Sequence, residues 1–140
     1  MFEEMKSTAM RLNAEFVKNN DILTVTERIL LFLGFKIHLI GTSYLAEAIT
    51  LKYYDEKLSC LNIYSQVAEK HDTAPGSVER AIRHAMHNCR SEGGITDFNL
   101  IVGYNAIDRK FDTTTSEFIS LVSKWLHWVR SAEQTESARQ

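Results

Sequence analysis

The chain has 140 residues, of which 44% are hydrophobic and 24% charged, and its formal net charge at pH 7 is −2. This length suffices for one domain with its own core, so neither a disulfide nor a metal is required to stabilise it. No apolar run approaches the roughly 20 residues of a membrane span. The first residues lack the pattern of a secretory signal, and Cys60 and Cys89 form no metal-binding or redox spacing. We therefore expect a cytoplasmic protein with reduced thiols.

The whole chain has only one proline and six glycines, a composition that favours helices. The N-terminal third is expected to contain three of them. Helical spacing of apolar residues predicts an amphipathic helix over 2–18. Thr24 and Glu27 have the form of a capping box, which predicts a second helix that begins there and ends near Gly34. Gly41 is expected to open a loop into a third helix over 44–54.

The middle of the chain contains two short amphipathic segments, 63–71 and 77–90, joined by the turn-like residues 72–76. Gly93 and Gly94 are expected to end the second segment as a left-handed cap. A short helix near 97–102 and a loop over 103–112 follow.

The last predicted helix begins at a second capping box, Thr114 to Glu117, and carries a buried stripe of apolar residues. The members of this stripe are Phe118, Leu121, Val122, Trp125 and Leu126. Residues 131–140 are polar and lack large apolar side chains, so we expect them to form an unstructured tail.

The segment 77–89 separates its residues onto two chemically different faces when it is drawn as a helix with 100° per residue. One face is apolar and contains Val78, Ile82, Ala85 and Cys89. The other face carries cations and hydrogen-bond donors, at Ser77, Arg80, Arg83, His84 and His87. A preceding helix, a tight turn and a second helix of this kind predict a helix-turn-helix that enters a major groove of DNA.

Four segments of the sequence resemble one known family. They are GFKIHLIGTSYLAEAI at 34–49, SVERAIRHA at 77–85, VGY at 102–104 and TTSEFISLVSKWL at 114–126. In order and spacing, residues 27–126 are similar to the C-terminal DNA-binding domain of the stage zero sporulation protein A family, the master response regulators of sporulation. The resemblance implies a six-helix fold with a central helix-turn-helix that binds promoter DNA, usually as dimers on adjacent sites.

Several residues are expected to contact DNA, given the two-faced helix and the resemblance together. In the family, the residues that match Glu79 and Arg80 read bases, with those that match Arg83 and His84 on the same surface. The full set expected to read bases is Ser77, Glu79, Arg80, Arg83, His84 and His87. The set expected to touch phosphates is Ser65, Lys70, Thr73, Arg90, Arg109 and Lys110.

The chain departs from the family pattern at two places. Ser77 stands where family members usually have an arginine, so it makes one hydrogen bond where an arginine makes two to guanine. About 22 residues precede the DNA-binding domain expected over 23–130, so we expect no receiver domain and no phosphorylation switch. The helix over 2–18 either replaces the dimerising role of the receiver or packs on its own domain.

The sequence therefore predicts an all-α, six- to seven-helix domain. Its expected parts are a helical extension over 1–22, a helix-turn-helix DNA-binding domain over 23–130 and the tail over 131–140. The predicted function is transcription regulation by a nucleoid-associated protein. The expected partners are double-stranded promoter DNA, a second copy at least on DNA, and RNA polymerase or a related regulator.

The residues also allow other functions. One alternative is a protein-interaction module or antagonist that keeps the fold but pairs with another regulator. His84, His87 and Cys89 are close in sequence, but Cys89 falls on the apolar face, so no metal site is expected. No nucleophile elbow, glycine-rich phosphate loop or HExxH-like element is present. We expect neither an enzyme nor a cofactor.

Overall fold

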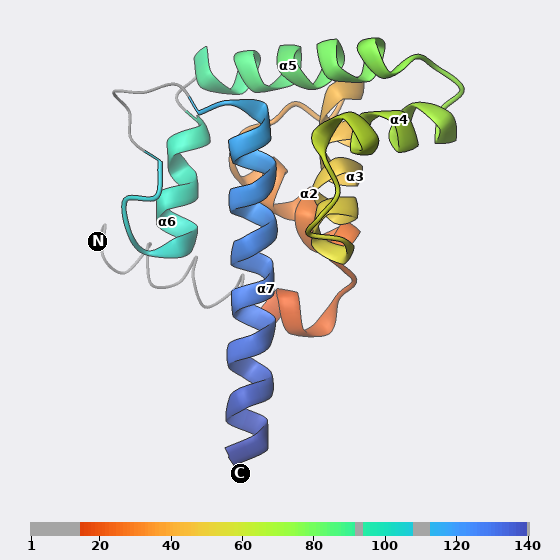
Figure 1. The fold of residues 1–140 in the computed structure, drawn as a ribbon. Helices are drawn as coiled ribbons and strands as arrows, with labels where there is room; N and C mark the ends of the chain where they lie inside the picture. Colours follow the sequence, from red (N-terminus) through yellow and green to blue (C-terminus); the bar gives the residue numbers. More distant parts are fainter. Residues whose placement is uncertain (1–14, 92–93, 108–112, 140) are drawn as a thin grey trace.

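The computed structural model describes the backbone of residues 15–91, 94–107 and 113–139. Over these ranges the chain forms helices and no strand, which confirms the all-α prediction (Figure 1). Residues 15–19 are helical. The elements that follow are α2 (Ile22–Phe32), α3 (Ile40–Tyr54), α4 (Cys60–Lys70), α5 (Pro75–Ser91), the 3-10 helix η1 (Gly94–Asp97), α6 (Phe98–Val102) and α7 (Thr115–Arg139). Helix α5 lies across one end of the molecule and contacts α3, α4 and α7 (Figure 1).

Helix α2 begins earlier than the sequence predicts. The Asp21 carboxylate accepts a hydrogen bond of 2.8 Å from the Thr24 backbone N–H, so Asp21 and not Thr24 is the N-cap. The capping-box prediction at Thr24 was wrong because an aspartate three residues earlier satisfies the same free amide. The hydrogen bond from the Thr24 backbone also holds the pKa of Asp21 below its ordinary value of 3.8.

Helix α3 also begins earlier than predicted, because Gly41 lies inside the helix and not in a loop. A Cβ atom at Gly41 would lie 1.9 Å from the Ala81 carbonyl oxygen of α5. Gly41 is therefore the position at which the backbones of α3 and α5 meet. Contact with α5 outweighs the low helix propensity of glycine at this position.

Three further expectations concern helix ends. Gly34 follows α2 with φ +95°, as its predicted role as a helix stop requires. The Glu117 N–H donates to Thr114 Oγ1 at 3.1 Å, which confirms the N-terminal bond of the predicted box on α7. Gly94 opens η1 and does not have the positive φ of the predicted left-handed cap. Gly93 lies outside the described residues.

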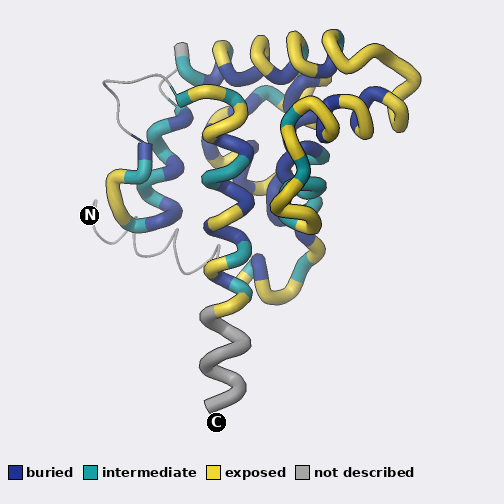
Figure 2. The backbone as a smooth tube through the Cα atoms, viewed as in Figure 1, coloured by how far each residue is buried: buried dark blue, intermediate teal, exposed yellow. Residues whose placement is uncertain are grey.

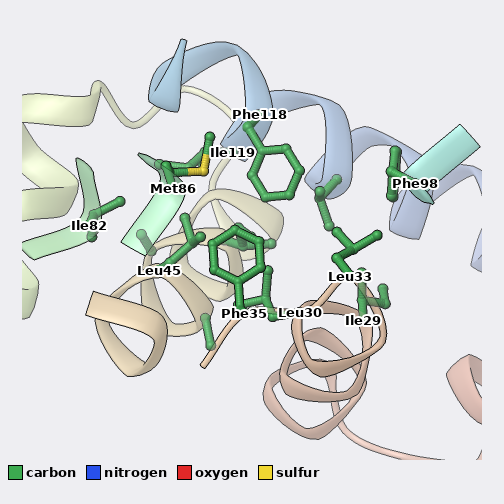
Figure 3. Packing of buried hydrophobic residues seen from close by; sticks show 14 of the residues in the cluster. Ile29, Leu30, Leu33, Phe35, Leu45, Ile82, Met86, Phe98, Phe118 and Ile119 are labelled. Carbon is green, nitrogen blue, oxygen red and sulfur yellow. The ribbon is translucent and has the colours of Figure 1, made fainter. Parts of the chain in front are cut away.

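The core is a continuous apolar cluster to which all of these helices contribute. Figure 3 shows Phe35 and Phe118 facing each other near its centre, with ring centroids 6.0 Å apart. Phe98 extends the cluster toward α7, where its ring lies 6.1 Å from that of Trp125. Four members of the predicted stripe on α7 are buried, and Leu121 is half-buried.

The N-terminal end of the described chain is attached to α7. The Arg130 guanidinium donates to the backbone oxygens of Val17 and Asn20, at 3.2 and 2.7 Å. The α7 backbone remains helical through Arg139, so the segment expected to be unstructured continues the helix. Alanine, glutamate, glutamine and arginine favour helices, and extending a helix requires less free energy than nucleating one. Most of the predicted helix over 2–18 lies outside the described residues.

Candidate nucleic-acid interface

Helices α4 and α5 form a two-helix unit with a four-residue connection, residues 71–74. Helix α4 is capped by the Ser59 hydroxyl, and so begins three residues before the predicted Ile63. The connection closes through a 3.0 Å hydrogen bond from the Thr73 N–H to the Ala68 oxygen. Asp72 takes a left-handed conformation with φ +52°, which a short aspartate tolerates better than a bulky residue does. This is the predicted helix-turn-helix.

Helix α5 begins at Pro75, where the absent proline amide has no intrahelical partner to lose. Its inner face is buried as predicted: Val78, Ile82 and Cys89 are 0% exposed and Ala85 is 1% exposed. Figure 2 shows this inner face in blue and the opposite face in yellow along most of the helix. The domain therefore fixes α5 along one side and leaves the other side open to solvent.

The predicted base-reading residues lie along the outer part of α5. Five of them are exposed, namely Glu79, Arg80, Arg83, His84 and His87, and Ser77 is half-buried. These six residues define the outer face of α5. Its cationic groups thus share one surface about three turns long.

Two internal contacts orient the arginines of the outer face. The Ser77 hydroxyl accepts a 3.3 Å hydrogen bond from Arg80 Nη2. Arg83 Nη1 lies 3.6 Å from Glu79 Oε1, an ion pair between positions i and i+4 in which the arginine side chain is 64% exposed. Such an exposed pair is weak and solvent-screened, so both guanidinium groups remain available to a partner.

Tyr64 supports α5 from the facing side of α4. Its side chain is 7% exposed, and burial raises the pKa of Tyr64 to about 12. The nearby Cys60 and Glu79 raise the pKa further, while Arg83 lowers it. Tyr64 is therefore a neutral packing residue at neutral pH.

The predicted phosphate-contacting residues do not form one group. Ser65, Lys70 and Thr73 are exposed on α4 and the turn, and Arg90 is half-buried near the end of α5. Lys70 already has a partner, because its ammonium lies 2.9 Å from Glu47 of α3. Arg109 and Lys110 lie outside the described residues.

Sequence reasoning missed the contribution of α3 to this unit. Glu47, in addition to its pair with Lys70, lies 2.7 Å from His71 Nε2, and the His71 ring packs against Tyr44. No spacing rule reveals a contact between residues 24 positions apart. The glycine at position 41 was the available signal, because a glycine within a helical pattern often marks a close backbone approach.

The structure offers no arrangement for metal binding within the described ranges, where no group of three or more histidine, cysteine or acidic side chains converges. Cys89 points inward and its thiol lies 3.4 Å from the Leu33 carbonyl oxygen. It therefore lies on the opposite side of α5 from His84 and His87. No described helix is both long and apolar enough to span a bilayer.

These observations define an all-helical domain of the helix-turn-helix class, with a second helix that exposes arginine, histidine and serine. A family model described as "Sporulation initiation factor Spo0A C terminal" matches residues 26–126. The match covers more than half of the chain, and the chain belongs to this family. Membership indicates a DNA-binding effector domain of the sporulation-regulator type, and this family is not a family of enzymes.

Proposed function

We propose that this protein is a sequence-specific transcription regulator that places α5 in the major groove of promoter DNA. The observation that carries the proposal is the outer face of α5, because its cations are exposed while the opposite side of the helix is buried. A helix of this form fits the roughly 12 Å width of the major groove.

Arg80 is the principal base-reading residue in this proposal. Its planar guanidinium has the geometry to donate two hydrogen bonds to the O6 and N7 atoms of guanine. Glu79 is placed to accept from the N4 amine of cytosine, and Ser77 contributes one hydrogen bond while it orients Arg80. Arg83, His84 and His87 extend the contacts along the groove.

Contacts to phosphates are proposed for Ser65 of α4, Thr73 of the connection and Arg90 near the end of α5. With a formal net charge of −2, the chain gains little from general attraction to DNA. We therefore propose that two copies bind adjacent half-sites, so that the second copy increases the apparent affinity.

The test begins by selecting bound sites from a random DNA pool with the wild-type chain. Affinity for the selected site and for a random duplex is then measured at several salt concentrations. Arg80→Ala should reduce the preference for the selected site by about tenfold, the size of one lost bidentate contact. Lys124→Ala is the matched control, because it removes one exposed positive charge from α7.

If Arg80→Ala and Lys124→Ala retain the same preference, Arg80 does not read bases. If the wild-type chain binds neither duplex at low salt, the DNA-binding proposal fails. The remaining candidate would then be the alternative function, a protein-interaction module that pairs with another regulator.

A further inference from the structure

The Glu47 carboxylate joins α3 to the last turn of α4 and to the connection that follows. One oxygen lies 2.9 Å from the Lys70 ammonium and the other lies 2.7 Å from His71 Nε2. The Glu47 side chain is only 16% exposed, compared with 65% for Lys70 and 32% for His71. Because the carboxylate is mostly shielded from water, its contacts are screened less than those of an ordinary surface pair.

His71 connects the Glu47 carboxylate to the turn between α4 and α5. Its backbone N–H closes the end of α4 by bonding to the oxygens of Val67 and Ala68, at 3.1 and 3.2 Å. Its ring packs on Tyr44 with a centroid separation of 5.0 Å. The residue that ends α4 is thus held through both backbone and side chain, and only residues 72–74 separate it from the start of α5.

Apolar packing does not fill the neighbouring space. A cavity of about 270 Å³ lies between α2, α3 and α4, and Glu47 and Lys70 form part of its wall. The other residues that line it are Leu23, Thr50, Leu51, Gln66 and Val67. The contacts of Glu47 with Lys70 and His71 join α3 to the end of α4 beside this space.

Helix α3 also touches α5 directly at Gly41, about 1.7 turns before Glu47. The same helix therefore fixes both the recognition helix and the turn that leads into it. We propose that Glu47 is a positioning residue, which sets the placement of the outer face of α5 relative to DNA by holding Lys70 and His71. This inference rests on the proposed function.

The proposal assigns Lys70 a different role from the one expected from sequence. A lysine that only contacts phosphate contributes equally to binding of any duplex. A lysine that holds the turn in place contributes more to binding of the selected site, because base contacts require correct distance and angle.

The experiment compares Glu47→Gln with Glu69→Gln. Both variants remove one negative charge, so they change general attraction to DNA equally, but only Glu47 holds the turn. Affinities for the selected site and for a random duplex are measured well below the unfolding temperature. The ratio of the two affinities should fall about fivefold in Glu47→Gln, which is the size expected for a partly shielded charge-assisted contact. In Glu69→Gln this ratio should equal that of the wild type.

Lys70→Ala is the second variant. It removes the contact between Glu47 and Lys70 by truncating the more exposed of the two side chains. It should also lower the preference, and the Glu47→Gln, Lys70→Ala double variant should lose less than the product of the two single losses, because both act on one contact. Equal losses on both duplexes for Lys70→Ala would return it to the phosphate-contacting group.

A lower melting temperature for Glu47→Gln with an unchanged preference would show a structural role alone and overturn the proposal. A wild-type chain that does not distinguish the two duplexes would overturn the proposed function together with this inference. The wild-type measurement therefore separates the two failures.

Discussion

The contact between α3 and α5 at Gly41 predicts that Gly41→Ala lowers the free energy of unfolding. Replacing a helical glycine with alanine ordinarily stabilises a helix by up to about 1 kcal/mol. At Gly41 the new Cβ would lie 1.9 Å from the Ala81 carbonyl oxygen and 2.5 Å from the carbonyl carbon. These are backbone atoms, which cannot rotate away as the end of a flexible side chain would.

The size of the effect follows from this geometry. A carbon–oxygen contact normally lies at about 3.3 Å or more, so α5 must shift by roughly 1.4 Å. Overpacking of this kind destabilises a core by about 1–3 kcal/mol, and the backbone clash places Gly41→Ala at the upper end. After subtraction of the propensity gain, we expect a loss of about 2 kcal/mol in the free energy of unfolding.

Urea unfolding measures this loss directly. With a slope of about 2 kcal/mol per molar urea, the midpoint should fall by about 1 M. Gly76→Ala is the control, because its Cβ would meet only Arg80 Nη1 at 3.6 Å, an ordinary van der Waals contact. That variant should be as stable as the wild type or slightly more stable. A Gly41→Ala variant that matches the wild-type midpoint would refute the close approach of α3 and α5.

Three further predictions concern other parts of the domain. Ile82→Ala, which truncates a side chain with 0% exposure, should lower the free energy of unfolding by about 2–5 kcal/mol, whereas Arg83→Ala on the opposite face should change it by less than about 0.5 kcal/mol in the same urea assay. Because the folded-state pKa of Asp21 is lowered, its stabilising contribution is present above its ordinary pKa of 3.8 and is lost as pH falls below it; acid unfolding of Asp21→Ala should therefore show a weaker pH dependence in that region than the wild type. Tyr64 should ionise near pH 12. When the ultraviolet absorbance of wild type and Tyr64→Phe is titrated with base, the two curves should therefore differ only above about pH 11. A difference centred near pH 10 would show that Tyr64 is not buried.

Much of the architecture could be predicted because it follows from helical periodicity. The buried stripe on α5 was predicted from the spacing of Val78, Ile82 and Cys89, and these residues are buried. The same wheel missed Met86, which is 1% exposed, because a stripe that packs against several helices is wider than four positions. Exposure of the outer face followed from the same pattern.

Helix starts were less predictable because several residues compete to cap them. Asp21 and Thr24 both carry suitable side chains, and in the structure Asp21 is the residue whose side chain caps α2. Gly41 was placed in a loop because glycine is a poor helix former, while the reason for a glycine there lies 40 residues later, at Ala81.

The contribution of Glu47 could not be predicted for a similar reason. Local rules describe pairs three or four residues apart in one helix, such as Glu79 and Arg83. Glu47 meets Lys70 and His71 only after α3 and α4 have packed side by side. Residues that hold a recognition helix in place are therefore harder to find from sequence than the residues it exposes.

The central claim is that the outer face of α5 is the surface that meets DNA. Nuclear magnetic resonance of the isotope-labelled chain, titrated with a duplex containing the selected site, tests this most directly. If α5 enters the major groove, the largest chemical-shift changes will fall on the side chains of Arg80 and Arg83 and on the backbone near them, with smaller changes at the turn before α5. Changes concentrated on α6 or α7, with α5 unaffected, would contradict it.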